Sequence, residues 1–413
     1  MQPLQHLKIL DLSRVLAGPW ATQMLGDMGA EIWKIERPVS GDETRGWGPP
    51  YICEPEAGEA GISAYFASTN RNKKSLAVDF TTPEGADIIH RLAAEADVLI
   101  ENFKVGGLQK YGLDYQSLRH KYPHLFYCSL TGFGQTGPDA SRAGYDFMIQ
   151  GMGGLMSVTG FSDNDPGGMP VKAGVALIDV LTGLNATTAI LAALEHRRMT
   201  GSGQHIDLAL FDVAVASMAN QAMNYLTTGM PPGRLGNAHP NIVPYQAFET
   251  QDGHIILAIG NDRQFAAFCH VAGCEALAAD EKFATNDGRV RHREELIPKL
   301  EPVLASRSTD NWLEILAEHA VPAGPVNDLR RVFDEPQARY RELQQASPEV
   351  DGVSHPIVAS PLRFSDAEVG CRLPAPRLGA HTVSVLSAEL GFDDARIAVL
   401  HKKGVIGISN QKI

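Results

Sequence analysis

Short apolar runs and longer amphipathic segments alternate in the first third of the chain. Runs typical of buried strands lie at residues 8–12, 31–35, 75–80, 97–102 and 125–130. Helical spacing lies between them at residues 19–28 and 82–96, and the second of these segments opens on Thr82 as a cap, followed by Pro83. Strands that alternate with helices predict a parallel α/β sheet that binds ligands at the carboxyl ends of its strands.

The pattern becomes helix-rich from residue 174 to about residue 227, and Pro231-Pro232-Gly233 then marks a boundary. A second unit is predicted to begin with a hairpin at residues 245–250 and 254–259. Further helices are predicted at residues 263–272, 293–305, 310–319, 334–345 (a connector) and 382–390. The tail is too short for a third domain, so we expect it to return to the first unit.

The composition is that of an ordinary globular protein, with 413 residues, 44% apolar and 20% charged. This length favours two domains. The net charge of −12 argues against a nucleic-acid partner, because phosphate binding needs a basic face. No uncharged apolar run of membrane-spanning length and no signal-peptide pattern is visible, so we expect a cytoplasmic protein without a membrane partner.

The five cysteines are scattered, which is typical of reduced thiols. Cys269 and Cys274 lack a second ligand pair at zinc spacing, so we expect no metal site.

A glycine-rich segment, Gly132 to Gly137, formally matches the dinucleotide-binding pattern. Pro138-Asp139 follows at once, and no neighbouring strand ends in the required acid. We interpret the segment as a loop at the carboxyl end of a strand that lines a cleft. The phosphate-binding and hydrolase signatures of the common nucleotide and ester hydrolases are missing.

Asp179 is the most informative single residue, because leucine, isoleucine and valine surround it at the start of a long apolar segment. A carboxylate in such surroundings loses hydration, so it is either a poised nucleophile or a helix-capping group. The local sequence alone favours capping. Basic residues near strand ends, at Lys34 and Arg37 and at residues 71–74, are either solvated surface or a phosphate-binding group.

Several segments in order along the chain carry a resemblance: residues 11–19, 29–38, 41–45, 70–75, 101–103, 132–138, 142–146 and 172–183. Together they resemble the class III CoA-transferase family, which includes formyl-CoA and carnitine-type CoA-transferases. Residues 242–248 and 260–265 look closest to the succinate/glutarate (dicarboxylate) branch. The resemblance runs from about residue 5 to about residue 406.

The resemblance implies an α/β fold with a large Rossmann-like domain built from both chain ends and a smaller inserted α+β domain. We therefore expect a large CoA-binding domain at residues 1–228, an inserted domain at 229–330, and a connector and return at 331–413. It also implies an interlocked homodimer.

The resemblance also implies the site. Asp179 is the nucleophile. The expected CoA contacts are Ala17, Arg37, Val78, Asp79, Asn102, Phe103, Lys104, Lys110, Thr131 and Phe133, and the expected acyl pocket is formed by Trp47, Tyr145, Gly260 and Asn261. No permanently bound cofactor is implied, because coenzyme A is a substrate. Leu16 replaces a glutamine of the oxalate enzymes, and Lys110 replaces an arginine. Arg45 and Arg142 are candidates for binding a distal carboxylate.

The activity implied is transfer of CoA from an acyl-CoA such as succinyl-CoA to an acid such as glutarate, through aspartyl anhydride and aspartyl-CoA thioester intermediates. Itaconate, mesaconate, malate and citramalate remain open as substrates. One alternative is an α-methylacyl-CoA racemase, but such enzymes carry Gly-His-Asp where this chain has Gly144-Tyr145-Asp146, and tyrosine is a poor base at neutral pH. The other alternative is a non-catalytic CoA-binding protein.

Overall fold

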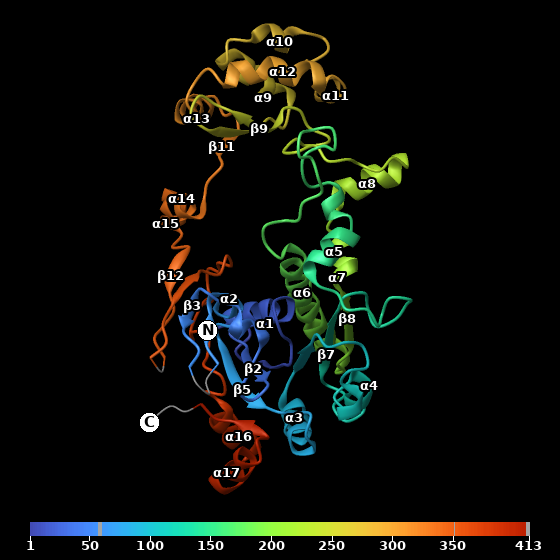
Figure 1. Cartoon of the computed structure of the whole chain (residues 1–413), viewed down its shortest axis with the longest axis vertical. Coiled ribbons are helices and arrows are strands. Elements are labelled where there is room, and N and C mark those ends of the chain that lie inside the picture. Colours follow the sequence, from blue (N-terminus) through green and yellow to red (C-terminus); the bar gives the residue numbers. More distant parts are fainter. Residues whose placement is uncertain (57–59, 351, 410–413) are drawn as a thin grey trace. The chain divides into compact units, whose positions relative to one another are not determined.

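Contacts divide the chain into two compact units in the computed structural model, which describes residues 1–56, 60–350 and 352–409 (Figure 1). Unit 1 comprises residues 1–154, 173–219 and 337–413, and unit 2 comprises residues 155–172 and 220–336. Unit 1 therefore contains segments from both ends of the chain. The domain boundaries that the sequence suggests, after residues 228 and 330, stay a prediction.

A seven-stranded sheet forms the centre of unit 1, in the order β14-β5-β2-β1-β6-β7-β8. All neighbouring pairs are parallel except β14, which pairs antiparallel with β5. The strands are β1 (Lys8–Asp11), β2 (Glu31–Glu36), β5 (Lys73–Val78), β6 (Val98–Glu101), β7 (Phe126–Thr131), β8 (His205–Ala209) and β14 (Ile406–Gly407). The predicted parallel α/β sheet is thus confirmed.

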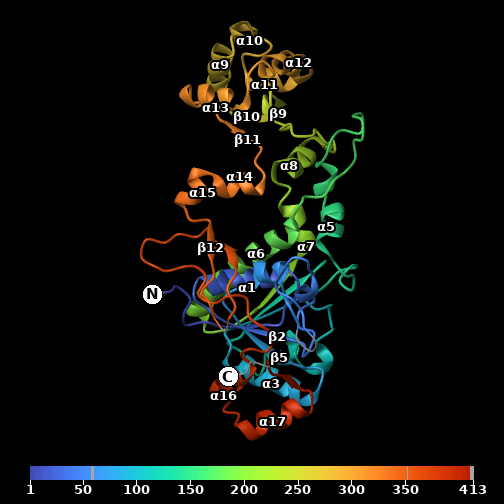
Figure 2. The same cartoon turned by 60° about the vertical axis from the view of Figure 1, so that its left-hand side comes forward.

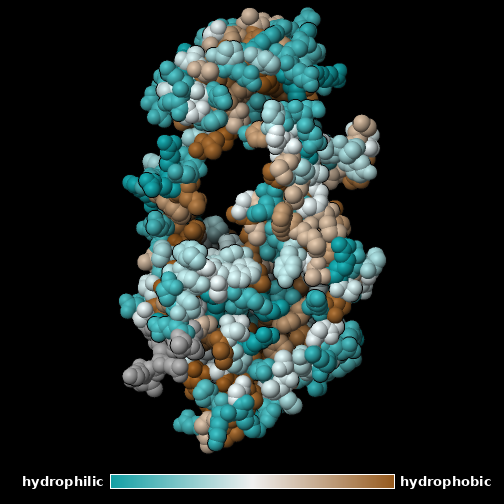
Figure 3. Space-filling view, in the orientation of Figure 1, coloured by the Kyte–Doolittle hydropathy of each residue, from teal (hydrophilic) through white to brown (hydrophobic). Residues whose placement is uncertain are grey.

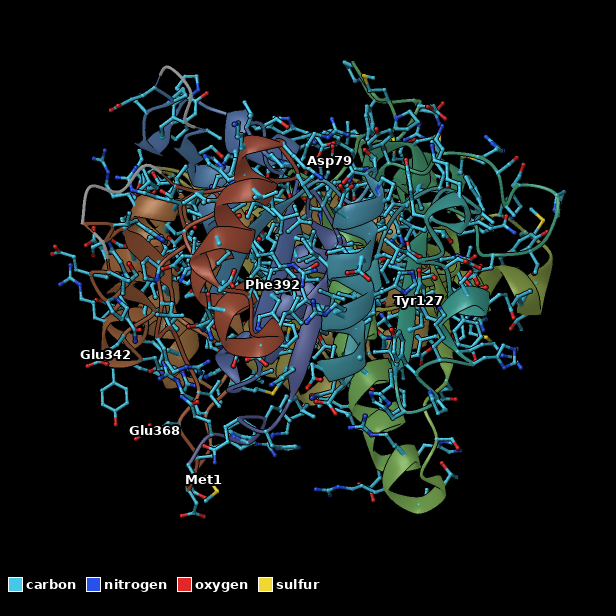
Figure 4. All side chains as sticks on the ribbon, turned by 90° about the horizontal axis from the view of Figure 1, so that it is seen from below. Met1, Asp79, Tyr127, Glu342, Glu368 and Phe392 are labelled. Atoms are coloured by element: carbon cyan, nitrogen blue, oxygen red, sulfur yellow. The ribbon has the colours of Figure 1, made fainter. Side chains whose placement is uncertain are left out.

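Alternating side chains of the strands bury the two faces of this sheet separately. Leu10, Trp33 and Leu99 lie in one core with α3 (Pro83–Glu95), α16 (Thr382–Leu390) and α17 (Asp394–Lys402). Ile9, Ile32 and Ile100 lie in the other core with α1 (Ala17–Asp27) and α6 (Leu177–Thr200). Phe392, labelled in Figure 4, belongs to the first core and stacks under Arg91 and Arg396.

The other elements of unit 1 are short and lie mostly at the ends of the sheet strands or in the C-terminal return. They are η1 (Glu43–Gly46), β3 (Tyr51–Cys53), β4 (Ile62–Ser63), α2 (Ala64–Thr69), η2 (Gln109–Tyr111), α4 (Tyr115–Leu118), α5 (Asp146–Met152), α7 (Leu210–Ala216), α15 (Pro336–Tyr340), β12 (Gln344–Ala346) and β13 (Pro356–Val358).

Unit 2 holds a three-stranded antiparallel sheet in the order β11-β10-β9 and a layer of helices (Figure 2). The predicted hairpin is confirmed as β9 (Tyr245–Glu249) and β10 (His254–Ala258). The remaining elements are η3 (Leu155–Ser157), α8 (Ala219–Thr228), α9 (Asp262–Val271), α10 (Glu275–Ala279), α11 (Asn286–Arg291), α12 (Arg293–Leu304), α13 (Thr309–Glu318), β11 (Ala323–Pro325) and α14 (Leu329–Asp334). Phe265, Phe268 and Trp312 lie in the core of this unit.

The predicted connector helix at residues 334–345 is confirmed only at residues 336–340. α14 ends at Asp334, because Pro336 forces the backbone of Glu335 out of the helical region (ψ 134°). A five-residue helix, α15, follows, and Gln344–Ala346 then becomes a strand that pairs antiparallel with β13. Pairing with a distant strand here overrides local helix propensity.

Helix α6 is the one helix in the described ranges whose length and composition would suit a membrane span, with a mean hydropathy of 1.7 over its most apolar window. Ala186, Ile190 and Ala193 of this helix are buried in the core with α1. The apolar run therefore reflects a core helix, and such a helix is weak support for a membrane span.

Candidate active site

Asp179 lies in the first turn of α6 and lines a cavity of about 240 Å³ in unit 1. The same cavity is lined by many of the residues that the sequence assigned to the site: Ala17, Trp47, Asn102, Phe103, Lys104, Thr131 and Tyr145. They come from the carboxyl ends of β6 and β7, the first residue of α1, the residue after η1 and the residue before α5. The structure therefore brings the predicted nucleophile together with part of the predicted CoA-binding segment and with Trp47 and Tyr145 of the predicted acyl pocket.

Two glycines fix how the loop after β7 meets the loop before α5. A Cβ on Gly144 would lie 2.3 Å from the Cα of Gly132, so the two backbones touch directly. Gly132 also lines the cavity, and it follows Thr131, the last residue of β7. The interpretation of this segment as a glycine-rich loop at a strand end is confirmed.

Asp146 supplies the cap that α6 lacks in its own sequence. The N-cap residue of α6, Ala176, has no capping side chain. Instead, the backbone N–H groups of Ile178 and Asp179 donate to Asp146 Oδ1 at 2.8 and 3.2 Å. Gln150 Nε2 donates to Asp146 Oδ2 at 2.6 Å and holds the cap in place. A second carboxylate is thus fixed beside Asp179.

This arrangement leaves the Asp179 carboxylate poorly solvated. Burial, and then the charge of Asp146, raise its pKa to about 7. No donor from the described residues 1–56, 60–350 or 352–409 forms a hydrogen bond with this carboxylate. A carboxylate without donors or a cation is an unsatisfied base and nucleophile.

A second cavity of about 410 Å³ in unit 1 contains the other predicted CoA contacts, Arg37, Val78 and Asp79. Phe103 lines both this cavity and the one that holds Asp179. Asp79, labelled in Figure 4, follows the last residue of β5, and its carboxylate accepts the N–H of Thr81. A CoA-sized ligand needs both a nucleotide site and a narrow acyl site, and these two cavities share a wall.

Four predicted residues line neither cavity. Phe133 packs against the ring of Phe211 and under the Arg142 guanidinium, and Lys110 lies over the ring of Tyr111. Gly260 and Asn261 lie in unit 2, where Asn261 Oδ1 caps α9 by accepting the N–H of Gln264. The place of these two residues in an acyl pocket stays a prediction.

Of the basic residues near strand ends, Lys34, Arg71 and Lys73 are buried in ion pairs rather than solvated, and phosphate binding stays a prediction at Arg37. Lys34 and Lys73 are fully buried and pair with Asp42 at 2.9 Å and Asp11 at 3.1 Å. Arg71 pairs with Asp27, and Lys74 pairs with Glu31. Buried charges must be paired, which explains why a basic cluster beside strand ends can be structural.

Arg45 is wrong as a candidate for the distal carboxylate. Its side chain is 1% exposed and donates from Nε and Nη2 to the two oxygens of Glu36 at 2.6 and 2.7 Å. Its third nitrogen donates to the carbonyl of Pro376. Arg142, by contrast, lines the Asp179 cavity, and its ion pair with Asp139 is exposed.

Sequence reasoning missed two residues at this site. Arg14 lines both cavities, its guanidinium lies 4.9 Å from the Phe103 ring centre, and its buried Nε has no hydrogen-bond partner among the described residues. Tyr65 packs edge-on against Trp47, and burial followed by the charges of Asp179 and Asp146 raises its pKa to about 12. Arg14 lies inside a segment of the resemblance, which was the only available signal.

Comparison with known proteins decides the family, because CoA-transferase family III matches residues 4–382. The chain belongs to CoA-transferase family III. It is 49% identical over 385 residues to a succinate–glutarate CoA-transferase of Agrobacterium fabrum, covering 93% of this chain and 95% of the relative. It is 43% identical over 408 residues to the human succinyl-CoA:glutarate CoA-transferase, covering 98% and 90%.

A solved structure is also similar to this chain over most of its length. A CAIB/BAIF family protein from Brucella suis has a TM-score of 0.81 at 49% identity, covering 94% of this chain and 99% of that one. This family III chain is therefore an enzyme that transfers CoA, and CoA thioesters are its substrates.

Proposed function

We propose that this family III enzyme transfers CoA from succinyl-CoA to glutarate, with Asp179 as the nucleophile. The relatives named for succinate and glutarate support the choice of acids. The observation that carries the proposal is the donor-free Asp179 carboxylate in a cavity shared with Asn102, Phe103 and Lys104. A nucleophile that is already partly desolvated needs less reorganisation to attack.

Four displacements account for the reaction. The Asp179 carboxylate attacks the succinyl thioester carbonyl, the C–S bond breaks, and CoA leaves as thiolate from a mixed anhydride. The thiolate attacks the Asp179 carbonyl carbon, succinate leaves, and an aspartyl-CoA thioester remains. Glutarate attacks this thioester and forms a second anhydride with release of thiolate. The thiolate then attacks the glutaryl carbonyl, which yields glutaryl-CoA and restores the Asp179 carboxylate.

The distal carboxylate of each acid is proposed to bind Arg142. Its partner Asp139 is 44% exposed, and exposed ion pairs contribute only about 0–1 kcal/mol, so the guanidinium can exchange partners. A guanidinium also suits bidentate contact with a carboxylate. Arg142→Gln should reduce the preference for glutarate over pentanoate, which lacks the distal carboxylate, by about tenfold. Unchanged preference in steady-state assays would assign that carboxylate to another group.

The nucleophile is tested by mixing the enzyme with succinyl-CoA, quenching, and measuring the intact mass. We expect a CoA adduct on the native protein that hydroxylamine removes, and no adduct and no turnover with Asp179→Asn. Turnover that survives in Asp179→Asn would refute the mechanism. The racemase alternative predicts deuterium uptake at the α-carbon of an acyl-CoA in heavy water, whereas the proposed reaction predicts none.

The enzyme is further proposed to be a homodimer, interlocked as the family resemblance implies. Exposed apolar side chains support a partner surface: α8 has no buried residue, and Met223 and Leu226 are 59% and 71% exposed. Apolar residues at the surface can be followed in Figure 3. Light scattering of the purified protein should give twice the 44.6 kDa chain mass, and a monomeric mass would exclude the dimer.

A further inference from the structure

A third cavity in unit 1, of about 450 Å³, is lined by residues of β6, β7 and β8 and has no role in the proposed chemistry. Phe103 and Lys104 line both this cavity and the one that holds Asp179. Its other walls include Glu101, Ser129 and His205. The predicted CoA-binding segment at residues 102–104 therefore lies between two cavities. Contacts that fix this segment on the side of the third cavity also affect the site that holds Asp179.

Glu101, Ser129 and His205 lie on the neighbouring strands β6, β7 and β8 and line the third cavity together. Ser129 is the register partner of Glu101, its side chain helps to lower the pKa of Glu101, and its Oγ lies 3.0 Å from His205 Nε2. The His205 ring stacks on Tyr115 with ring centres 4.5 Å apart, and it meets the edge of Tyr127 (labelled in Figure 4). The imidazole is thereby held with one nitrogen facing Ser129.

Glu101 also anchors the CoA-binding segment directly. The backbone N–H of Phe103 donates to Glu101 Oε2 at 2.7 Å. The adjacent Asn102 is clamped to the loop before α1, because its Oδ1 accepts the N–H of Arg14 and its Nδ2 donates to the Arg14 carbonyl. Glu101 thus holds Phe103, and the Arg14 backbone holds Asn102.

The surroundings of Glu101 place its ionisation near neutrality. Burial raises its pKa to about 7, against the hydrogen bonds from Ser129 and Phe103, which lower it. Burial also lowers the pKa of His205, while the charge of Asp207 raises it. The other titratable or charged groups that face this carboxyl are Lys104, Asp114, Tyr115, Tyr127, Cys128 and Asp207.

We propose that Glu101 is a positioning residue of the CoA-transfer site, which holds residues 102–104 through the Phe103 N–H and holds them most firmly when it is ionised. The carboxylate is the stronger acceptor for the Phe103 N–H, because charge-assisted hydrogen bonds are the stronger ones.

The proposal rests on the proposed CoA transfer and predicts a split between kinetic constants. Glu101→Leu removes the acceptor for Phe103, so KM for succinyl-CoA should rise about tenfold while kcat stays within about threefold, since Asp179 is untouched. Glu101→Gln keeps an acceptor oxygen and should restore KM to within about threefold of the native value. The proposal is overturned if kcat falls as much as KM rises, or if Glu101→Gln raises KM as much as Glu101→Leu does. It is also overturned if Glu101→Leu leaves KM unchanged.

A binding measurement in a variant without the Asp179 carboxyl tests whether the ionisation of Glu101 controls CoA binding. CoA affinity is measured by calorimetry from pH 5.5 to 8.5 in the Asp179→Asn background. We expect the affinity to increase about threefold as pH rises through about 7 and to become flat when Glu101→Gln is added. Adding Ser129→Ala instead should move the change to higher pH, because the Ser129 hydrogen bond lowers the pKa of Glu101.

These outcomes separate the two proposals. If Asp179→Asn keeps turnover, the proposed nucleophile fails whatever Glu101 does. If Asp179→Asn is inactive but the affinity profile is the same with Glu101 and with glutamine, the positioning role alone fails.

Discussion

Unit 1 holds two kinds of poorly solvated carboxylate, one paired with cations and one without. Asp42 and Glu36 lie in the first group, where each faces a buried cation and several further donors. Asp179 and Glu101 form the second group, and neither has a cation partner among the residues that the structure describes. Both kinds lie near the carboxyl ends of the same sheet.

The electrostatic outcome differs by several pKa units. Burial by itself raises the pKa of Asp42, but Lys34 and the donors from Thr44 outweigh it, and the pKa falls to about 2. At Asp179, burial and the charge of Asp146 act in the same direction, and the pKa rises to about 7. Burial alone therefore does not mark a reactive carboxylate in this protein. A reactive carboxylate is marked by burial without a compensating cation or donor.

The largest expected effect comes from breaking a pair in the first group. Arg45→Met leaves Glu36 as an unpaired buried charge, so the free energy of unfolding should fall by roughly 3–5 kcal/mol in chemical denaturation. Adding Glu36→Met should recover most of the loss, since it removes the stranded charge.

Arg198→Met is the matched control, because Arg198 forms an ion pair with Glu195 in which the two side chains are 75% and 64% exposed. Its effect should stay within about 1 kcal/mol. If Arg45→Met instead left stability unchanged and raised KM for glutarate, Arg45 would belong to the substrate site after all.

Removing a carboxylate of the second group should change the free energy of unfolding by less, and in the opposite direction. The pKa of Asp179 in the folded protein, about 7, lies above the ordinary value near 4 of an unfolded chain. The folded state therefore binds more protons than the unfolded state between about pH 4 and pH 7, and this carboxylate lowers stability as pH rises through that window. Asp179→Asn should raise the free energy of unfolding at pH 8 by roughly 1–2 kcal/mol.

The gain in free energy of unfolding from Asp179→Asn should shrink as the pH falls. It should vanish below about pH 4, where the native carboxyl is protonated in both the folded and the unfolded state. Denaturation curves at pH 4, 6 and 8 measure it. A variant that is equally stable or less stable than the native protein at pH 8 would mean that Asp179 has an unseen stabilising partner.

The fold could be predicted for those segments whose own sequence shows a strand or helix pattern. The buried strands of the sheet and the Thr82-capped helix follow from apolar runs and capping residues in the sequence. Strand β8 was missed, because His205 and Asp207 interrupt its apolar character and instead face the third cavity. The connector was mispredicted because β12 depends on a partner strand that local propensity does not encode.

The site was predictable only in part, for a related reason. The position of Asp179 near a helix start in apolar surroundings is visible in the sequence, but its lack of donors is not. The same limit explains the errors at Lys34, Lys73 and Arg45, whose acidic partners are fixed by packing between elements. Which charge meets which partner is decided by the tertiary fold.

The smallest expected effect concerns how Asp146 tunes Asp179. Asp146→Asn keeps an oxygen to accept the N–H groups of Ile178 and Asp179 but removes the charge that raises the pKa of Asp179. Because the attacking group is the carboxylate, kcat/KM should rise with pH through about 7 in the native enzyme, and this rise should move to lower pH in the variant. Glu195→Gln removes a charge from the exposed far end of the same helix and should leave the profile unchanged. A pH profile that stays fixed in Asp146→Asn would show that burial alone sets the reactivity of Asp179, and the contrast between the paired and unpaired carboxylates would then rest on solvation rather than on neighbouring charge.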